Sequence, residues 1–317
     1  MPVYESQMSR WGAIARMLPP TFGKIFFVAH GSDSFAGDLL SEFPVDKDGV
    51  PRVYITTAGA DTDNLAIQAA LDACVDSRND YVIVLPSNND YDLAAVLTMS
   101  KRDVHLIGMD YLFNKQECGS NSATKIHQVA DYDIITLTGG NCEIAGFYFK
   151  NYNNQGTIVN ATGTCDCPHI HHNHFNLNAT TTAGVPQIDF SASGSSFVLI
   201  EKNTIATNVS DLTFSSIINV SSSCTWAKVL DNNIIIGDGC TATIGIANYG
   251  YKGQTSGNTV AGLSGGGGAS GTVSTAIAIG GGIANDNRLN VVNSADYGTA
   301  GTYSFLANYS HAINHVS

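Results

Sequence analysis

The chain has 317 residues, of which 13% are charged, and its 15 basic and 27 acidic side chains give a net charge of −12. This acidic balance argues against a surface that neutralises phosphate, so nucleic acid is not expected as a partner. An ordinary soluble domain carries about 25% charged residues, because its helices need solvated faces. Low charge together with 32 glycines and 44% hydrophobic residues therefore indicates a folded, β-rich protein. No stretch reaches the roughly 20 apolar residues that span a bilayer, so no membrane partner is expected.

Residues 1–52 are predicted to form an N-terminal arm outside the repeating part of the chain. A short helix begins near residue 9, ends at Pro19 and Pro20, and leads into an apolar strand over residues 25–28. The aromatic side chains of this arm would suit a docking surface on a larger assembly or a second subunit. They are Trp11, Phe22, Phe26 and Phe27. The alternative is that the same side chains pack across the end or side of the protein.

Residues 61–77 predict one amphipathic helix, and it is expected to be the only substantial one. An Asp or Thr can cap its first turn, and apolar residues at positions 65, 67, 71 and 75 give it an apolar face. Short apolar stretches follow at 81–86, 97–100 and 104–108. Their length and the polar turns between them are typical of β-strands.

From residue 169 onward one short pattern returns, in which an Asn lies two residues before an apolar side chain. The spacings are 30, 30, 25 and 29 residues. The repeated residues are Asn173, Asn203, Asn233, Asn258 and Asn287. In the first three copies, an aliphatic residue lies three positions before the Asn, namely Ile170, Ile200 and Leu230.

A second series of alternating stretches runs between these copies, at 187–190, 217–220, 243–246 and 276–279. Two strand signals per period predict strands that stack in parallel, with aliphatic side chains on aliphatic side chains and Asn on Asn. The predicted fold is therefore all-β, a single-stranded parallel β-helix over residues 53–317, with the helix at about 61–77 capping its open end. An up-and-down antiparallel barrel is the alternative, but its hairpins every ~8–12 residues would not keep this period.

The segments TDNLAIQAALDAC, YVIVLPSNNDYD and LTMSKRDVHLIG, in this order, resemble the opening of the pectin-lyase-like right-handed β-helices. The resemblance covers residues 53–317 and implies a right-handed solenoid. That superfamily includes lyases, hydrolases, phage tailspikes and inert scaffolds, so the fold alone does not select a function.

The arm followed by EFPVDKDGVPRVY is similar to virion proteins of tailed bacteriophages. This resemblance implies a capsid decoration or cement subunit on the capsid exterior of the virion, bound to the major capsid protein and assembled as a homotrimer. Such a subunit would stabilise the shell or present an outer surface, which could hold a host-surface glycan. No cofactor is expected.

The second functional hypothesis is a carbohydrate-binding or carbohydrate-cleaving β-helix, similar to a tailspike depolymerase. Glu201 and Asp231 both lie two residues before a repeated Asn, so the spacing would place them on neighbouring coils. Two carboxylates about 5 Å apart suit a retaining glycosidase. The alternative is that this position is a solvated turn.

A metal site is the other chemical hypothesis, because the segment from Cys165 to His174 is rich in Cys, His and Asp. His169 and His171 are its candidate ligands, since imidazoles bind zinc and iron. The alternative is that these histidines fill turn positions. The seven cysteines are too sparse for a disulfide framework and are expected to be buried free thiols. The glycine-rich tract at 262–271 lacks the lysine of a phosphate-binding loop.

Overall fold

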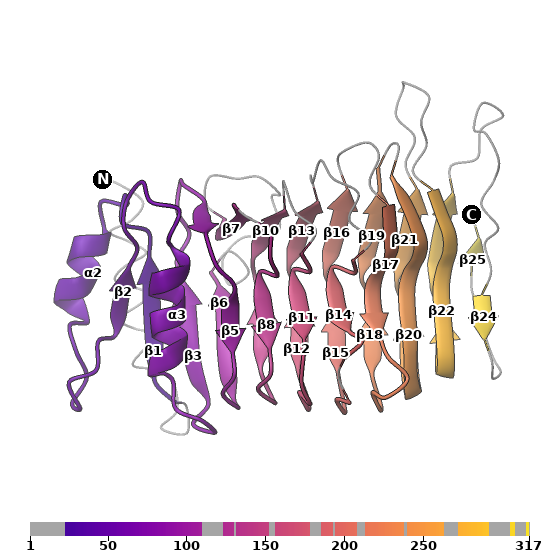
Figure 1. Ribbon diagram of the computed structural model, residues 1–317, viewed down its shortest axis with the longest axis horizontal. Coiled ribbons are helices and arrows are strands. Elements are labelled where there is room, and N and C mark those ends of the chain that lie inside the picture. The colour runs from indigo at the N-terminus through magenta and orange to yellow at the C-terminus, as the bar shows by residue number, and fades with distance from the viewer. Residues whose placement is uncertain are drawn as a thin grey trace.

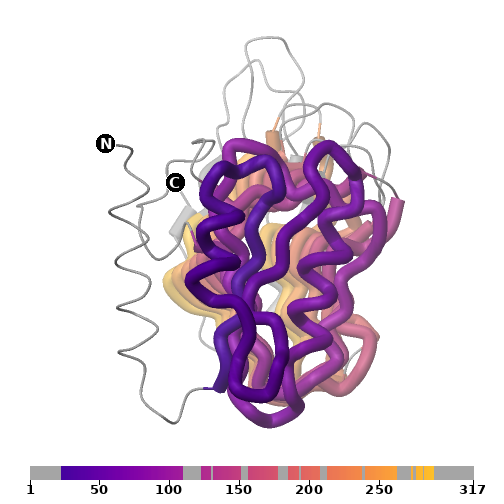
Figure 2. Tube along the Cα trace, turned by 90° about the vertical axis from the view of Figure 1, so that its left-hand side faces the viewer, coloured from indigo at the N-terminus to yellow at the C-terminus, as the bar shows by residue number. Residues whose placement is uncertain are grey.

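The computed structural model describes residues 23–109, 123–129, 131–151, 156–177, 185–192, 194–207, 213–237, 240–262, 272–291, 305–307 and 315–316. In this part of the chain, parallel strands stack into two long sheets, one of 16 strands and one of nine. The fold is all-β, and its stacked strands form a β-helix-like solenoid, as the repeat predicted. Successive coils follow one another along the long axis (Figure 1), and a view along that axis shows them lying one behind another (Figure 2).

The strands form three columns that run the length of the solenoid. Column A contains β2 (Val53–Ile55), β1 (Ile25–Ala29), β3 (Asp80–Val84), β6 (Val104–Gly108), β9 (Glu143–Ala145), β12 (His169–His171), β15 (Leu199–Glu201) and β18 (Lys228–Leu230). Column B contains β5 (Leu97–Met99), β8 (Ile135–Leu137), β11 (Val159–Ala161), β14 (Ile188–Phe190), β17 (Thr213–Val220) and β24 (Phe305–Ala307). Two long strands pass from column B into column A, β20 (Thr241–Ser256) and β22 (Thr272–Asn285).

Column C is the separate sheet of nine strands. It contains β4 (Tyr91–Leu93), β7 (Lys125–Gln128), β10 (Tyr148–Asn151), β13 (His174–Leu177), β16 (Thr204–Thr207), β19 (Asn233–Ile236), β21 (Thr259–Gly262), β23 (Arg288–Val291) and β25 (His315–Val316). From β3 onward, the described coils contribute a strand to A, then to C, then to B. The sequence pattern gave only two of these three strands per period, because the A and C strands are separated by a single turn.

The core is a stack of aliphatic side chains, one level per coil. In column A, Ile144, Ile170 and Ile200 pair in register, and all three are 0% exposed. Val229 continues the row opposite Ile200. Each such burial contributes about 1.5–3 kcal/mol relative to an exposed side chain. The prediction that Leu230 belongs to this row is wrong by one residue, because the coil between the two positions is one residue shorter than the 30 that the pattern assumed.

Strand β1 corrects the predicted boundary at residue 52. It pairs in parallel with β2 on one side and β3 on the other, so residues 25–29 belong to the sheet. Phe26 is 0% exposed in the main core and Phe27 is 3% exposed in a second apolar cluster on the outer face. The docking role predicted for these two side chains is therefore wrong, and the packing alternative holds. Trp11 and Phe22 lie outside the described residues.

Two helices are described, and both lie near the first strands (Figure 1). Helix α3 (Asn64–Ala73) is shorter than the predicted 61–77, because the chain is extended again at Cys74. Its residues Ile67 and Leu71 enter the main core. Helix α2 (Ala36–Glu42) was not predicted, and it covers the outer face of β1 through Leu39. Neither described helix has the length and apolar composition needed to cross a bilayer.

A ladder of buried asparagines runs along the corner between columns A and C. Asn203 Oδ1 accepts hydrogen bonds of 3.1 Å from both the backbone N–H and the side-chain amide of Asn173. The second amide hydrogen of Asn173 goes to the Ile144 carbonyl at 2.9 Å. The same three bonds recur at Asn203, Asn232 and Asn258. The ladder asparagines are Asn173, Asn203, Asn232, Asn258 and Asn287.

The predicted stacking of Asn on Asn is confirmed, with one correction. The ladder residue is Asn232, which is 1% exposed, and Asn233 is instead the first residue of β19. Coil lengths of 29 and then 26 residues place Asn232 between Asn203 and Asn258. Two consecutive asparagines satisfied the sequence pattern almost equally well, and only the register decides between them.

The described cysteines form no disulfide. Five of them are buried, as predicted, and burial raises the pKa of the Cys142 thiol to about 12 and that of Cys165 to about 11. Cys167 is exposed, so the prediction is wrong for this residue. Cys118 lies outside the described residues.

Candidate functional site

A second corner, at the start of the column A strands, has a left-handed backbone on coil after coil. Seven residues in register there have φ between 54° and 64°. They are Asn79, Asp103, Asn141, Cys167, Phe197, Trp226 and Lys252. Asn and Asp tolerate this conformation, whereas it is a genuine outlier for a bulky side chain and costs roughly 1–2 kcal/mol. The early coils therefore have Asn or Asp, which tolerate the left-handed conformation, and the later coils have Cys, Phe, Trp and Lys at the same position.

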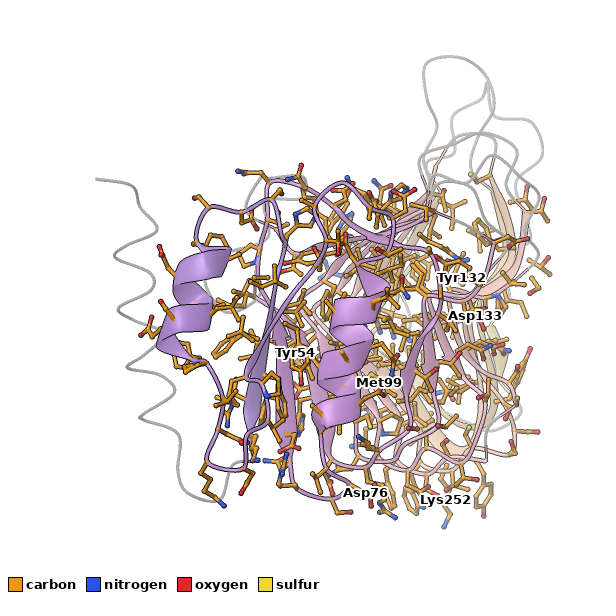
Figure 3. All side chains as sticks on the ribbon, turned by 60° about the vertical axis from the view of Figure 1, so that its left-hand side comes forward. Tyr54, Asp76, Met99, Tyr132, Asp133 and Lys252 are labelled. Carbon is orange, nitrogen blue, oxygen red and sulfur yellow. The ribbon has the colours of Figure 1, made fainter. Side chains whose placement is uncertain are left out.

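The later positions of this corner carry an exposed aromatic stack. Phe197 is 57% exposed and Trp226 is 45% exposed, and their rings lie nearly parallel with centroids 6.3 Å apart. Lys252 places its Nζ 4.7 Å from the Trp226 ring centroid and 5.3 Å from that of Tyr251. Tyr251 is itself 58% exposed. We call these four residues the aromatic corner. Figure 3 labels Lys252, which lies near the lower edge of the molecule in that view.

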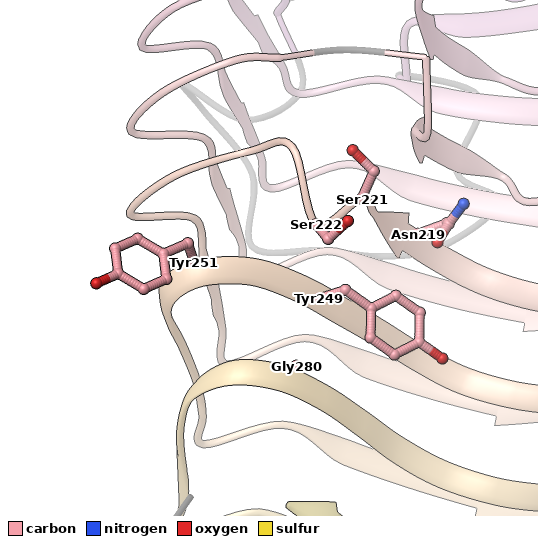
Figure 4. Close-up of a pocket in the computed structure, with 6 residues that line it drawn as sticks. All are labelled: Asn219, Ser221, Ser222, Tyr249, Tyr251 and Gly280. Atoms are coloured by element: carbon pink, nitrogen blue, oxygen red, sulfur yellow. The ribbon is translucent and has the colours of Figure 1, made fainter. Parts of the chain in front are cut away.

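A groove adjoins the aromatic corner and shares Tyr251 with it. The groove has a volume of about 590 Å³, and its walls are polar and aromatic (Figure 4). Its lining residues are Asn219, Ser221, Ser222, Tyr249, Tyr251 and Gly280. Gly280 keeps the strands close, since a Cβ there would lie 2.7 Å from the Tyr249 carbonyl oxygen. The groove and the corner together offer aromatic rings, hydroxyls, an amide and one cation along a continuous surface.

A buried asparagine shapes the segment of β20 that carries these aromatic residues. Asn248 is 2% exposed, and its amide donates to Thr255 Oγ1 at 3.1 Å. Its Oδ1 accepts from the Gly250 backbone N–H at 3.3 Å. The register against β22 shifts on both sides of Tyr251. Such an irregularity re-aims side chains at a strand edge, and here Asn248 holds the backbone that turns Tyr251 outward.

The structure does not place the predicted catalytic carboxylates opposite each other. Glu201 pairs with Leu230, whereas Asp231 is one residue further along, in a left-handed turn with φ of 53°. The predicted shared register is therefore wrong, for the same reason that Asn233 was wrong. Glu201 instead lies beside His169, with Oε1 3.1 Å from the imidazole Nε2.

The structure brings the predicted histidine ligands together and adds a carboxylate. His169 and His171 alternate with the inward Ile170, so both lie on the outer face of β12, and their rings stack with centroids 3.8 Å apart. Glu143 Oε1 lies 2.7 Å from His171 Nε2, and its Oε2 lies 2.7 Å from His105 Nδ1. Burial alone raises the pKa of Glu143, but these two hydrogen bonds outweigh it and hold that pKa well below its ordinary value. We call Glu143, His169 and His171 the His–Glu cluster.

Sequence reasoning missed both the aromatic corner and Glu143. A signal for the corner was present, because Cys167, Phe197, Trp226 and Lys252 each lie six residues before a ladder asparagine. The one-residue error at Asn233 hid this regularity. Glu143 could not be found from the repeat, because its coil precedes the first ladder asparagine.

Comparisons with known proteins add no relative. No protein-family model matches the chain, and searches of curated proteins and of solved structures likewise give no match. What this chain binds is therefore inferred from the geometry of these surfaces.

Proposed function

We propose that this chain is a non-enzymatic β-helical protein that binds a polysaccharide at the aromatic corner and the adjoining groove. The observation that carries the proposal is the exposed stack of Phe197 and Trp226 at backbone positions that disfavour aromatic residues. Strained positions persist where the surrounding fold holds them, and they gather at binding sites. Asn or Asp at the same positions of earlier coils shows that the fold does not need an aromatic ring there.

The chemistry of the surface suits a sugar chain. The C–H face of a pyranose stacks on an aromatic ring, and its hydroxyls pair with groups such as the Ser221 and Ser222 hydroxyls and the Asn219 amide. Lys252 supplies a cation beside the rings, which favours sugars that carry a carboxylate. A nucleic acid also stacks on aromatic rings, but the net charge of −12 opposes it. An extended glycan can follow successive coils, which are spaced about 4.8 Å apart.

The finer description of the fold belongs to the same proposal. We infer a right-handed, single-stranded β-helix of the pectin-lyase-like type, with α3 protecting its first coils. The parallel register of all three columns supports this description, as does the packing of α3 against β1, β2, β3 and β5. A rigid solenoid suits the role, because it fixes the spacing between binding groups on neighbouring coils.

Binding without cleavage is favoured over a depolymerase, because the register separates the two carboxylates that would have formed a catalytic pair. Glu201→Gln is the test of the enzymatic alternative. If the wild-type chain releases reducing ends from a bound polysaccharide and Glu201→Gln abolishes that release, the alternative gains the support that it now lacks.

Capsid decoration, with the major capsid protein as partner and a homotrimeric assembly, stays a prediction from the resemblance. A glycan-binding solenoid is compatible with a position on the capsid exterior. Deleting residues 1–22 and measuring binding to intact capsids would test it, because this deletion removes Trp11 and Phe22 and leaves the buried strand β1 in place. Unchanged capsid binding would contradict a docking arm.

The direct test of glycan binding is a panel of neutral and uronic-acid polysaccharides in affinity electrophoresis or calorimetry. We expect Trp226→Asn and Tyr251→Ser each to weaken binding at least about 10-fold, because central aromatic contacts carry much of the energy of an interface. Leu65→Gln is the matched control, since it removes an exposed apolar side chain from α3. The proposal fails if the wild-type chain binds none of the panel, or if both corner variants bind as it does.

A further inference from the structure

The His–Glu cluster lies on the outer face of column A and shares no residue with the aromatic corner, and it has the composition of a metal centre. One donor atom from each of Glu143, His169 and His171 lies within 4.8 Å of the others. Three ligands around a single ion, at about 2.1 Å from it, must themselves lie about 3–3.5 Å apart. The side chains therefore need only small rotations to close on one ion.

Two hydrogen-bonded strands fix the three donors. His169 and His171 are two residues apart on β12, so their side chains point to the same face at neighbouring positions. Glu143 is the direct cross-strand partner of His169 on β9. Donors on paired strands are held more precisely than donors on loops, which is the condition that a metal site requires.

Outer partners orient two of the three donors, Glu143 and His169. His105 Nδ1 holds the second oxygen of Glu143, and the Asn79 amide oxygen lies 2.6 Å from the other ring nitrogen of His105. Glu201 lies 3.1 Å from His169 Nε2. Metal-binding imidazoles and carboxylates have supporting groups of this kind. Glu201 would thus act as a positioning residue and not as the catalytic carboxylate that the sequence suggested.

We propose that Glu143, His169 and His171 bind a divalent transition-metal ion of the zinc class. Two imidazole nitrogens and one carboxylate oxygen match the ligand preferences of zinc and of neighbouring first-row ions. The side chain of His171 is 8% exposed, whereas those of Glu143 and His169 are 24% and 32% exposed. The cluster is therefore closed toward the sheet and open toward solvent, which leaves a coordination position for water or an external ligand.

The test uses the untagged full-length chain, stripped with a chelator and titrated with ZnCl₂ by calorimetry. We expect one ion per chain, and X-ray absorption of that ion should show two imidazoles and oxygen at about 2.0–2.2 Å. Glu143→Gln and His169→Asn should each weaken binding at least 100-fold. His127→Asn is the control, because His127 pairs with Asp92 on column C, and its affinity for zinc should equal that of the wild type.

His169 is the most exposed of the three ligands, so His169→Asn gives the decisive variant if the others fold poorly. The proposal is overturned if the wild-type chain binds no stoichiometric zinc, or if His169→Asn binds as tightly as the wild type. A coordination shell dominated by sulfur would also overturn it, since the ion would then sit on exposed Cys167. The X-ray absorption spectrum of zinc bound to the wild-type chain distinguishes nitrogen and oxygen ligands from sulfur even where no variant folds.

Discussion

The two left-handed corners of this solenoid share a backbone conformation and differ in what supports it. At the ladder corner, the left-handed residue of each coil immediately precedes a buried asparagine, as His172, Lys202 and Asp231 do. The asparagine makes two hydrogen bonds to the asparagine of the next coil and a third to a backbone carbonyl of the preceding coil. At the aromatic corner no such ladder is described, and Phe197 and Trp226 face outward. One corner therefore holds the coils together, and the other displays side chains.

The comparison explains how residue choice is divided between the corners. At the ladder corner the buried amide is indispensable, so the left-handed residue before it can vary among His, Lys, Asp and Gly. At the other corner the described side chains of Phe197 and Trp226 face outward, so packing in the core does not select them. A bulky residue there needs a reason outside the fold, which is why that corner is the better candidate for binding.

The ladder should produce the largest loss of stability. Asn232→Ala removes the acceptor of two hydrogen bonds from Asn203. It also removes the amide that donates to the buried Ile200 carbonyl. Each unsatisfied buried group costs about 1–3 kcal/mol. We expect the free energy of unfolding, from urea denaturation, to fall by about 3 kcal/mol.

Asn233→Ala is the matched control for this prediction. Asn233 begins β19 at a half-buried position, and its loss should cost no more than about 0.5 kcal/mol. Equal effects of the two variants, or the larger effect at Asn233, would mean that the register of the ladder is wrong and that the sequence pattern had identified the right residue.

This one-residue difference shows how far the sequence could predict the fold. The parallel stacking and the asparagine ladder followed from periodicity, and the strand at residues 25–28 followed from its local apolar sequence. The register did not, because coil length varies and a pair such as Asn232 and Asn233 fits the same pattern twice. Every error at the candidate sites came from register or from burial, including Leu230, Asp231 and the aromatic residues of β1.

The cysteines sharpen the comparison chemically, because Cys165 and Cys167 are only two residues apart. Cys165 is buried, whereas Cys167 is exposed at the left-handed position that is in register with Phe197 and Trp226. Burial raises the pKa of Cys165 to about 11, so its thiolate fraction at pH 8 is about 100-fold below that of an ordinary thiol. We expect iodoacetamide to label Cys167 at least 100-fold faster than Cys165, as read from fragment masses of the peptide that contains both. Denaturant should remove the difference, and comparable labelling of both thiols in the folded chain would contradict the assigned corner.

The smallest effect is also the most direct measure of strain at the aromatic corner. Trp226→Ala and Trp226→Asn both remove the stacking on Phe197 and the contact with Lys252, which together contribute about 1 kcal/mol at an exposed site. They differ in the backbone, because Asn adopts the left-handed conformation at low cost and Ala does not. Trp226→Asn should therefore be about 1 kcal/mol more stable than Trp226→Ala, and close to the wild type, while both lose polysaccharide binding. Equal stability of the two variants would mean that the left-handed backbone at Trp226 is not strained. Glycan binding would then be supported by the exposure of the rings alone.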